Sequence, residues 1–292
     1  SSNKRKMKIL FYAVFVLLLF NQCAKKVDTP LWITIDKWDL LDNPFASGQG
    51  EMTANITDAW VNVNNKVIGV FELPIKIPII GVPGDYEFIL IPGVRSNGIN
   101  ATKIRYPFME QYRQTISLSQ TDTAYLKPST MYYEDLNFFV EDFEDPLNIK
   151  METDPISNTS LVTTNDPSIV AYGNYCGHIP LNDSDSLFSG YTNENGGLDL
   201  PIGADVFLEM DYYNTNTLLT TVLGISSNGI DEEPHIQLNA QENPVWKKIY
   251  IDLKEIVSFQ NADVYQVGFT AILNELGTEK DIYIDNIKVI HY

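Results

Sequence analysis

Apolar and polar residues alternate through most of the chain after residue 30. Leu31, Ile33 and Ile35 recur at every second position, which is the pattern of a strand with one buried face. Similar short runs follow to the end of the chain, separated by Gly, Pro, Asn and Asp. Only residues 253–259 offer a candidate helical turn. The pattern therefore predicts an all-β protein with little helix.

Residues 31–133 are predicted to form one antiparallel β-sandwich. Two β-rich runs, 59–63 and 67–71, are separated by a short Asn-rich link, which is the strongest hairpin signal in the chain. Runs 114–119 and 124–127 flank another short link and predict a second hairpin. Short strands with frequent turns and no helical period are typical of such a sandwich.

Two further segments shape this first half. The apolar run 73–80 contains Pro74 and Pro78, which lack a backbone donor, so it is predicted to be an edge strand or extended crossover. Residues 93–107 are predicted to form a long polar loop. Together with 182–197 it is the most polar long connection, and we expect any protein interface to lie on these loops.

A break in the alternation between Pro128 and Leu136 predicts a boundary, and residues 134–292 are expected to form a second sandwich, of the jelly-roll kind. Its expected strands lie at 206–213, 219–225, 235–238, 247–253, 265–273 and 281–292.

The last of these strands carries a slip in its alternation. Ile282 and Ile284 share one face, whereas Ile287 and Val289 share the other. Because strand side chains alternate with a period of two, the phase can change only where an extra residue is inserted. The sequence therefore predicts a bulge or bend at residues 285–286.

The N-terminal segment has a different pattern. Ile9 to Phe20 is an unbroken apolar run of 12 residues behind four basic residues. A bilayer-spanning helix needs roughly 20 residues, so residues 1–22 are predicted to be an export signal. Cys23 follows closely and resembles the acylated cysteine of bacterial lipoprotein signals. The resemblance implies a covalent lipid on Cys23, a tether over residues 23–30, and a lipid-anchored, surface-exposed location at the outer membrane.

The charge balance narrows the class of partner. The chain has a formal charge of −18, and loss of the four basic residues before Cys23 takes it to −22. Such a field repels nucleic acid and anionic lipid headgroups, so we exclude nucleic acid as a partner and expect anionic lipid headgroups to be poor partners. The hydrophobic fraction of 44% and the aromatic fraction of 12% support packed cores, so the chain is not intrinsically disordered.

Residues 58–74, with the loop 97–102 leading to 106–108, resemble a family of Bacteroidota outer-membrane lipoproteins. The resemblance covers mainly residues 31–133 and implies an immunoglobulin- or transthyretin-like sandwich. It brings no catalytic motif.

The second half resembles the galactose-binding-like jelly-roll modules found beside many carbohydrate-active proteins. Residues 142–145 at its start and 283–289 at its end carry the likeness. In such modules an acidic side chain on the first strand and one on the last often share a structural calcium, and Glu144 and Asp285 are the matching positions. Calcium needs six to eight oxygen ligands, so other groups would have to complete the site. The alternative is that both are solvated acids in an acidic protein.

Motifs for catalysis are missing from the sequence. It contains no His-Glu-x-x-His, no Gly-x-Ser-x-Gly and no phosphate-binding glycine loop. Cys176 has His178 two residues away, but the chain has two cysteines and three histidines, so a buried, inert thiol is the favoured interpretation. Acidic pairs arise by chance among 38 acids. We therefore predict that the protein is not an enzyme.

Two binding functions remain. We favour a scaffold or accessory subunit docked on an integral outer-membrane protein or complex, such as assembly, export or import machinery. The alternative is a glycan-binding lipoprotein whose jelly roll holds a sugar. A sugar binder should expose planar aromatics beside Asn, Asp or Arg, whereas a subunit should expose an apolar patch. The aromatic candidates for stacking on sugar rings are Tyr172, Tyr175, Tyr191, Tyr212, Tyr213 and Trp246, most of which could equally belong to the core.

Overall fold

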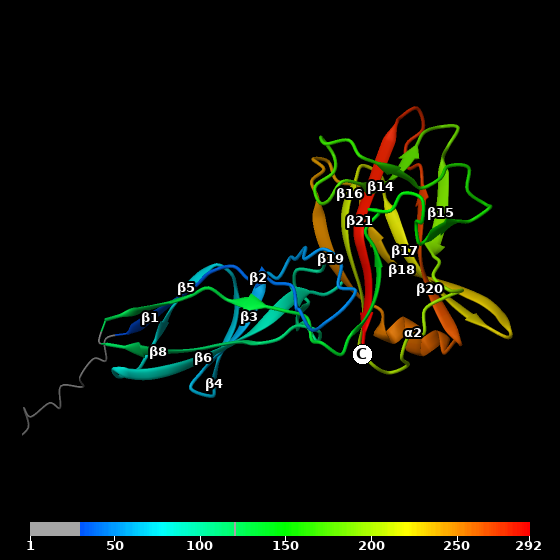
Figure 1. The fold of residues 1–292 in the computed structure, drawn as a ribbon. Helices are drawn as coiled ribbons and strands as arrows, with labels where there is room; N and C mark the ends of the chain where they lie inside the picture. The colour runs from blue at the N-terminus through cyan, green and yellow to red at the C-terminus, as the bar shows by residue number, and fades with distance from the viewer. Residues whose placement is uncertain (1–29, 120) are drawn as a thin grey trace, which may run out of the picture.

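The computed structural model describes residues 30–119 and 121–292 and confirms the all-β prediction. Two β bodies lie end to end, the first blue to green and the second green to red (Figure 1). Among the described residues there is one helix, α2 (Lys254–Gln260), where the sequence predicts a helical turn. No helix in this part of the chain is both long enough and apolar enough to cross a membrane.

The first sandwich pairs a five-stranded sheet with a three-stranded one. The five-stranded sheet contains β4 (Lys66–Glu72), β3 (Asp58–Val63), β6 (Gly84–Arg95), β7 (Lys103–Arg105) and β8 (Tyr112–Leu118), with β7 and β8 both paired to β6. The three-stranded sheet has the order β5 (Ile75–Ile79), β1 (Leu31–Ile35) and β9 (Thr123–Leu126). Two short strands, β2 (Asp39–Leu40) and β10 (Ser129–Thr130), pair beside them.

The predicted hairpin of β3 and β4 is confirmed. Asn64 and Asn65 connect the two strands with positive φ angles of 49° and 60°, as the two central residues of a type I′ turn require. The edge position of β5 is also confirmed, because among the described strands β5 pairs only with β1. Its Pro78 therefore lies where the missing N–H costs little.

The second predicted hairpin is wrong. β8 pairs with β6, whereas β9 pairs in parallel with β1, so the link between them carries the chain from one sheet to the other. Alternation indicates which face of a strand is buried but not which strand is its neighbour. The expected loop at 93–107 is also shorter than predicted, because β6 runs to Arg95 and β7 begins at Lys103.

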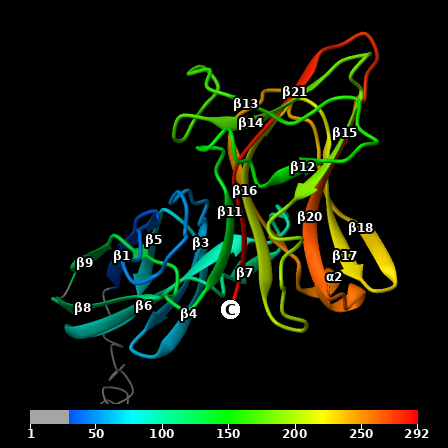
Figure 2. The same ribbon diagram turned by 45° about the vertical axis from the view of Figure 1, so that its right-hand side comes forward.

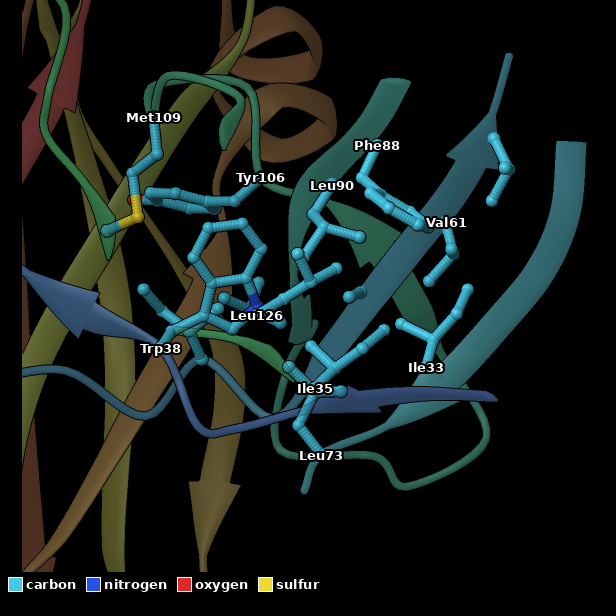
Figure 3. Close-up of a cluster of buried hydrophobic side chains, with 14 of the residues drawn as sticks. Ile33, Ile35, Trp38, Val61, Leu73, Phe88, Leu90, Tyr106, Met109 and Leu126 are labelled. Atoms are coloured by element: carbon cyan, nitrogen blue, oxygen red, sulfur yellow. The ribbon is translucent and has the colours of Figure 1, made fainter. Parts of the chain in front are cut away.

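Inward-facing side chains of the two sheets form one hydrophobic core. Ile33 and Ile35 of β1 meet Val61 of β3 and Phe88 and Leu90 of β6 (Figure 3). All five are completely buried, so the alternation that predicts these strands also selects the residues of the core.

The second sandwich consists of two larger sheets. One contains β13 (Val162–Thr164), β14 (Cys176–Leu181), β21 (Lys280–His291), β16 (Val206–Asn214) and β19 (Lys247–Asp252), with β11 (Asn137–Glu141) also on β21. The other contains β12 (Met151–Thr153), β15 (Leu187–Thr192), β20 (Val264–Ile272), β17 (Leu218–Ser226) and β18 (Gly229–Leu238). We call the first of these the junction sheet, since it faces the first sandwich (Figure 2).

The predicted slip in β21 is confirmed. The register with β16 shifts between Glu209, which pairs with Lys288, and Asp211, which pairs with Asp285. Asn286 is the extra residue and adopts a positive φ of 48°, which asparagine tolerates better than most residues.

The expected loop at 182–197 is wrong, because it contains β15. Gly190 interrupts the apolar pattern of that strand and hid it from a pattern-based prediction. A Cβ at this position would lie 2.8 Å from the backbone oxygen of Glu152 and 2.7 Å from the Phe188 ring, so only glycine fits without rearrangement.

The two sandwiches are packed against each other. Phe207, Tyr250 and Ile290 project from the junction sheet into the core of the first sandwich. Tyr106 of the first sandwich lies edge-on to Phe207 and Tyr250, with ring centroids 5.3 Å and 5.0 Å apart. Aromatic contacts of this kind stabilise an interface beyond the area they bury.

Candidate functional site: a cleft between the two sandwiches

The base of the site is a set of buried charges on the outer face of the junction sheet. Strand alternation points Glu209 and Lys248 away from the core of the second sandwich, where water would normally solvate them. The first sandwich covers them instead, and Glu209 is completely buried. Its carboxylate accepts hydrogen bonds from Tyr106 at 2.6 Å and from Tyr132 at 2.9 Å, and it pairs with Lys248 at 3.2 Å.

These contacts fix the protonation state of the tyrosines. Burial raises the pKa of Tyr106 and of Tyr132 well above the ordinary value, and the negative charge of Glu209 raises both further. Both hydroxyls therefore stay protonated and donate to Glu209. A buried charge needs such partners, because an unpaired one costs several kcal/mol.

A second group of buried polar side chains adjoins the first. Asp211 accepts hydrogen bonds from Thr53 at 2.6 Å and Asn286 at 3.2 Å, while Lys248 also donates to Thr53 at 3.0 Å. Thr53 comes from the first sandwich, so these bonds join the two bodies. The arrangement fixes the relative position of the walls above it.

Above this base lies a cleft of about 500 Å³. Its size is in the range of small-molecule sites. The first sandwich contributes Ala54, Asn55, Thr57, Arg95, Gly98 and Asn100, and the second contributes Tyr172, Asp211, Tyr212, Trp246, Lys247, Lys248, Ile249 and Tyr250. Both bodies are therefore needed to form it.

The aromatic wall of the cleft comes from the second sandwich. Tyr172 is 37% exposed and Trp246 is half-buried. The indole Nε1 of Trp246 donates to the carbonyl oxygen of Ile169 at 2.8 Å, which attaches the Tyr172 loop to the end of β19. The Tyr213 ring lies 6.2 Å from the Trp246 ring, so the indole is supported from its neighbouring strand.

The opposite wall presents polar groups held in place by ion pairs. Arg95 donates to the Asn100 side chain at 2.7 Å and pairs with Glu72 at 2.8 Å. Its Nε atom is buried without a hydrogen-bond partner, 3.6 Å from Asp58. Asp58 is fully buried and also pairs with Lys103 at 2.5 Å. Arg95 is thus oriented before any ligand arrives.

The loop after β6 also joins the two bodies. The Asn97 N–H donates to the Tyr250 carbonyl oxygen at 2.8 Å, and the Asn97 side chain accepts from the Asp252 N–H at 2.9 Å. The polar loop predicted as an interaction site therefore lines the cleft with Gly98 and Asn100.

The structure brings three of the six predicted aromatics together. Tyr172, Tyr212 and Trp246 line the cleft, whereas Tyr191 lies on β15 in the other sheet and Tyr175 packs partly against the core. The polar residues of the first sandwich were missed, because sequence alone does not show which faces of two domains meet. The Asn-rich loop at 97–100 was the one signal for them.

The two predicted calcium residues do not line the cleft, although Asp285 pairs in register with Asp211. The Glu144 carboxylate accepts hydrogen bonds from the Asn174 and Tyr175 N–H groups at 2.7 Å and 2.9 Å. Burial raises the pKa of Glu144, but a hydrogen bond from the Asn174 side chain at 2.8 Å and these two backbone bonds outweigh it and hold the pKa below its ordinary value. Asp285 is buried, and its Oδ2 has no partner.

The calcium site therefore stays a prediction. The unpartnered Asp285 oxygen is available to a cation, but the Glu144 oxygens are already occupied by N–H donors. In the described part of the chain, no three His, Cys, Asp or Glu side chains converge in the manner of a metal site.

Cys176 is completely buried, and burial raises the pKa of its thiol to about 12, so it stays unreactive at neutral pH. His178 contacts Asp281 at 2.7 Å and stacks on Tyr283 at 4.5 Å, which gives it a structural role. Cys23 falls outside the described residues, and its acylation stays a prediction.

Comparison with known proteins identifies no family. No family model and no curated protein matches the chain. Among solved structures, a carbohydrate-binding module of the β-sandwich superfamily aligns over 78% of this chain and 83% of its own, with 15% identity and a TM-score of 0.39. The xylan-binding domain CBM22-2 of Paenibacillus barcinonensis Xyn10C aligns over 53% of this chain and 99% of its own, with 13% identity and a TM-score of 0.37.

The K1 cleaved adhesin domain of Lys-gingipain from Porphyromonas gingivalis W83 aligns over 52% of this chain and 97% of its own, at 15% identity and a TM-score of 0.35. Likenesses at this level describe β-sandwich architecture and carry no argument about ligands. Function is therefore inferred from the residues that line the cleft.

Proposed function

We propose that the protein is a non-catalytic, membrane-anchored carbohydrate-binding protein that holds an oligosaccharide in the cleft between its two sandwiches. The observation that carries this proposal is the convergence of Tyr172 and Trp246 with Arg95, Asn55 and Asn100 in one cleft. The C–H face of a sugar ring buries apolar surface against an aromatic ring, while amide and guanidinium groups bind its hydroxyls. Planar aromatic rings beside Asn and Arg side chains are what a sugar binder should expose, whereas a subunit should expose an apolar patch.

The cleft lacks the pair of acids that glycoside hydrolysis needs. Such enzymes place two carboxyl groups on either side of the scissile bond. Among the described residues that line the cleft, Asp211 is the only acid, and it already bonds Thr53 and Asn286. Binding without cleavage is the chemistry that this arrangement supports.

Screening the purified chain against an array of oligosaccharides tests the proposal. Replacing Trp246 by alanine removes part of the stacking wall, so we expect affinity for the bound sugar to fall about tenfold, equivalent to about 1.4 kcal/mol. Tyr191→Ala is the matched control, because Tyr191 is a half-buried aromatic on the other sheet. An array without any binding sugar, or equal losses from both substitutions, would contradict the proposal.

A role as accessory subunit of an outer-membrane protein is the second candidate, and one observation favours it. β4 pairs only with β3 among the described strands, so its other edge is free. Val67 and Val70 on this strand are 64% and 39% exposed. A free apolar edge can accept a strand from a partner.

Detergent extraction of tagged protein separates the two candidates. The subunit role predicts one integral outer-membrane protein that copurifies with the wild type and is lost after Val67→Lys. The carbohydrate role predicts that this substitution leaves sugar affinity unchanged, because Val67 does not line the cleft and lies at the opposite end of β4 from Glu72, the residue that pairs with Arg95.

A further inference from the structure

The outer face of the sheet β5–β1–β9 carries a second set of exposed apolar and aromatic side chains. Alternation places Leu31, Ile33 and Ile35 in the core, so Trp32 and Thr34 face outward from β1. On β9, Tyr125 faces outward and is 70% exposed.

The strand register gathers these residues on one surface. Trp32 lies between Pro78 and Thr123, and Thr34 lies between Lys76 and Tyr125. The Lys76 ammonium is 5.0 Å from the centre of the Trp32 ring. Tryptophan, tyrosine and lysine together are the side chains that favour the boundary between water and hydrocarbon.

The same surface extends into the loop after β5, where Ile80 and Val82 are 86% and 69% exposed. We call Trp32, Pro78, Ile80, Val82 and Tyr125 the tip face. Single exposed apolar residues are ordinary, but apolar and aromatic side chains grouped on one surface mark an interaction site.

The position of the tip face points to what covers it. Leu31 pairs with Ile79, so Ile80 lies opposite residue 30, where the described chain begins. In both views β1 begins at the end of the first sandwich that is remote from the second sandwich (Figures 1 and 2). Seven residues separate Cys23 from Leu31. Such a stretch spans at most about 25 Å when fully extended, so a membrane anchor at Cys23 keeps this end beside the bilayer.

We propose that the tip face rests in the headgroup region of the lipid bilayer. The inference rests on the membrane anchor of the proposed function but not on the sugar. A contact of this size is weak alone, but tethering raises the local concentration of lipid so that a weak contact suffices. No tip-face residue lines the cleft, so contact of the tip face with lipid leaves the cleft open to sugars.

The test places a fluorescent probe on the tip face of the full chain. Ile80→Cys is labelled with an environment-sensitive dye in membrane-bound protein and reconstituted into phosphatidylcholine vesicles that contain nitroxide-labelled lipid. Leu276→Cys is the matched control, because Leu276 is 82% exposed but lies in the second sandwich. Both positions are exposed loop residues, and Cys176 is buried and will not react.

We expect nitroxide lipid to quench the probe at position 80 at least threefold more than the probe at position 276. Equal quenching at the two positions in vesicle-bound protein overturns the tip-face proposal and leaves the anchor intact. A chain that stays in solution overturns both the anchor and the tip face. Sugar binding on the array is independent of either result.

Discussion

At the scale of single residues, the interface between the sandwiches depends on charges that are buried rather than solvated. Lys288 is fully buried beside Lys248 and donates to the Glu51 carbonyl oxygen. Burial, and after it the positive charge of Lys248, lower the pKa of Lys288 to about 8. Glu209 and Asp211 oppose this shift but do not cancel it.

This shift predicts a pH dependence of stability. As the pH rises from 8 to 9.5, Lys288 loses its proton in the folded state while the unfolded chain still holds it, so the contribution of Lys288 to the free energy of unfolding should rise with pH. Urea unfolding at pH 8.0, 8.8 and 9.5 measures the slope. Lys288→Met should flatten it, while Lys66→Met, at an exposed hairpin position, should leave it unchanged. An unchanged slope in Lys288→Met would show that the buried amine does not titrate in this range.

At the scale of elements, local chemistry determined the features that the sequence predicted correctly. The β3–β4 turn, the edge strand β5, the helix α2 and the bulge at Asn286 each follow from residues within a few positions of one another. Pairing between distant strands does not, because alternation in β8 and β9 is equally compatible with either sheet. β15 was missed because it contains Gly190, which breaks the apolar pattern. Glycine is needed there because the backbone of Glu152, on β12, lies too close for a side chain, and the sequence near Gly190 does not show this contact.

The candidate site shows the same division. Aromatic residues of the second sandwich could be nominated from the sequence, and Tyr172, Tyr212 and Trp246 do line the cleft. Arg95 and Asn55 could not, because their role depends on how the first sandwich docks. The 2.6 Å hydrogen bond from Thr53 to Asp211 joins residues 158 positions apart, so the sequence around either residue does not predict it.

The β3–β4 turn gives a direct test of the element-scale argument. Asn65→Val should destabilise the protein by about 1–2 kcal/mol, because a β-branched residue is strained at a positive φ angle. Asn65→Gly should be neutral or slightly stabilising, because glycine adopts that angle freely. Denaturant midpoints of both variants provide the measurement, and equal midpoints would refute the type I′ assignment.

At the scale of the whole molecule, the two sandwiches form the cleft together. Neither body alone forms the cleft, and the buried contacts of Glu209, Asp211 and Lys248 hold its walls in register. Residue 30, where the described chain begins, and the cleft lie on different parts of the first sandwich, so the proposed anchor and the proposed sugar site would not compete. Because these contacts hold the walls in place before a ligand binds, less conformational entropy is lost on binding.

Hydrogen–deuterium exchange with and without the sugar identified on the array tests the central claim most directly. The claim is that ligand contacts both sandwiches at once. It predicts simultaneous protection of residues 54–57 and 95–100 in the first sandwich and of residues 246–250 in the second. Protection confined to a single sandwich, or located on the sheet of β15 and β20, would contradict it.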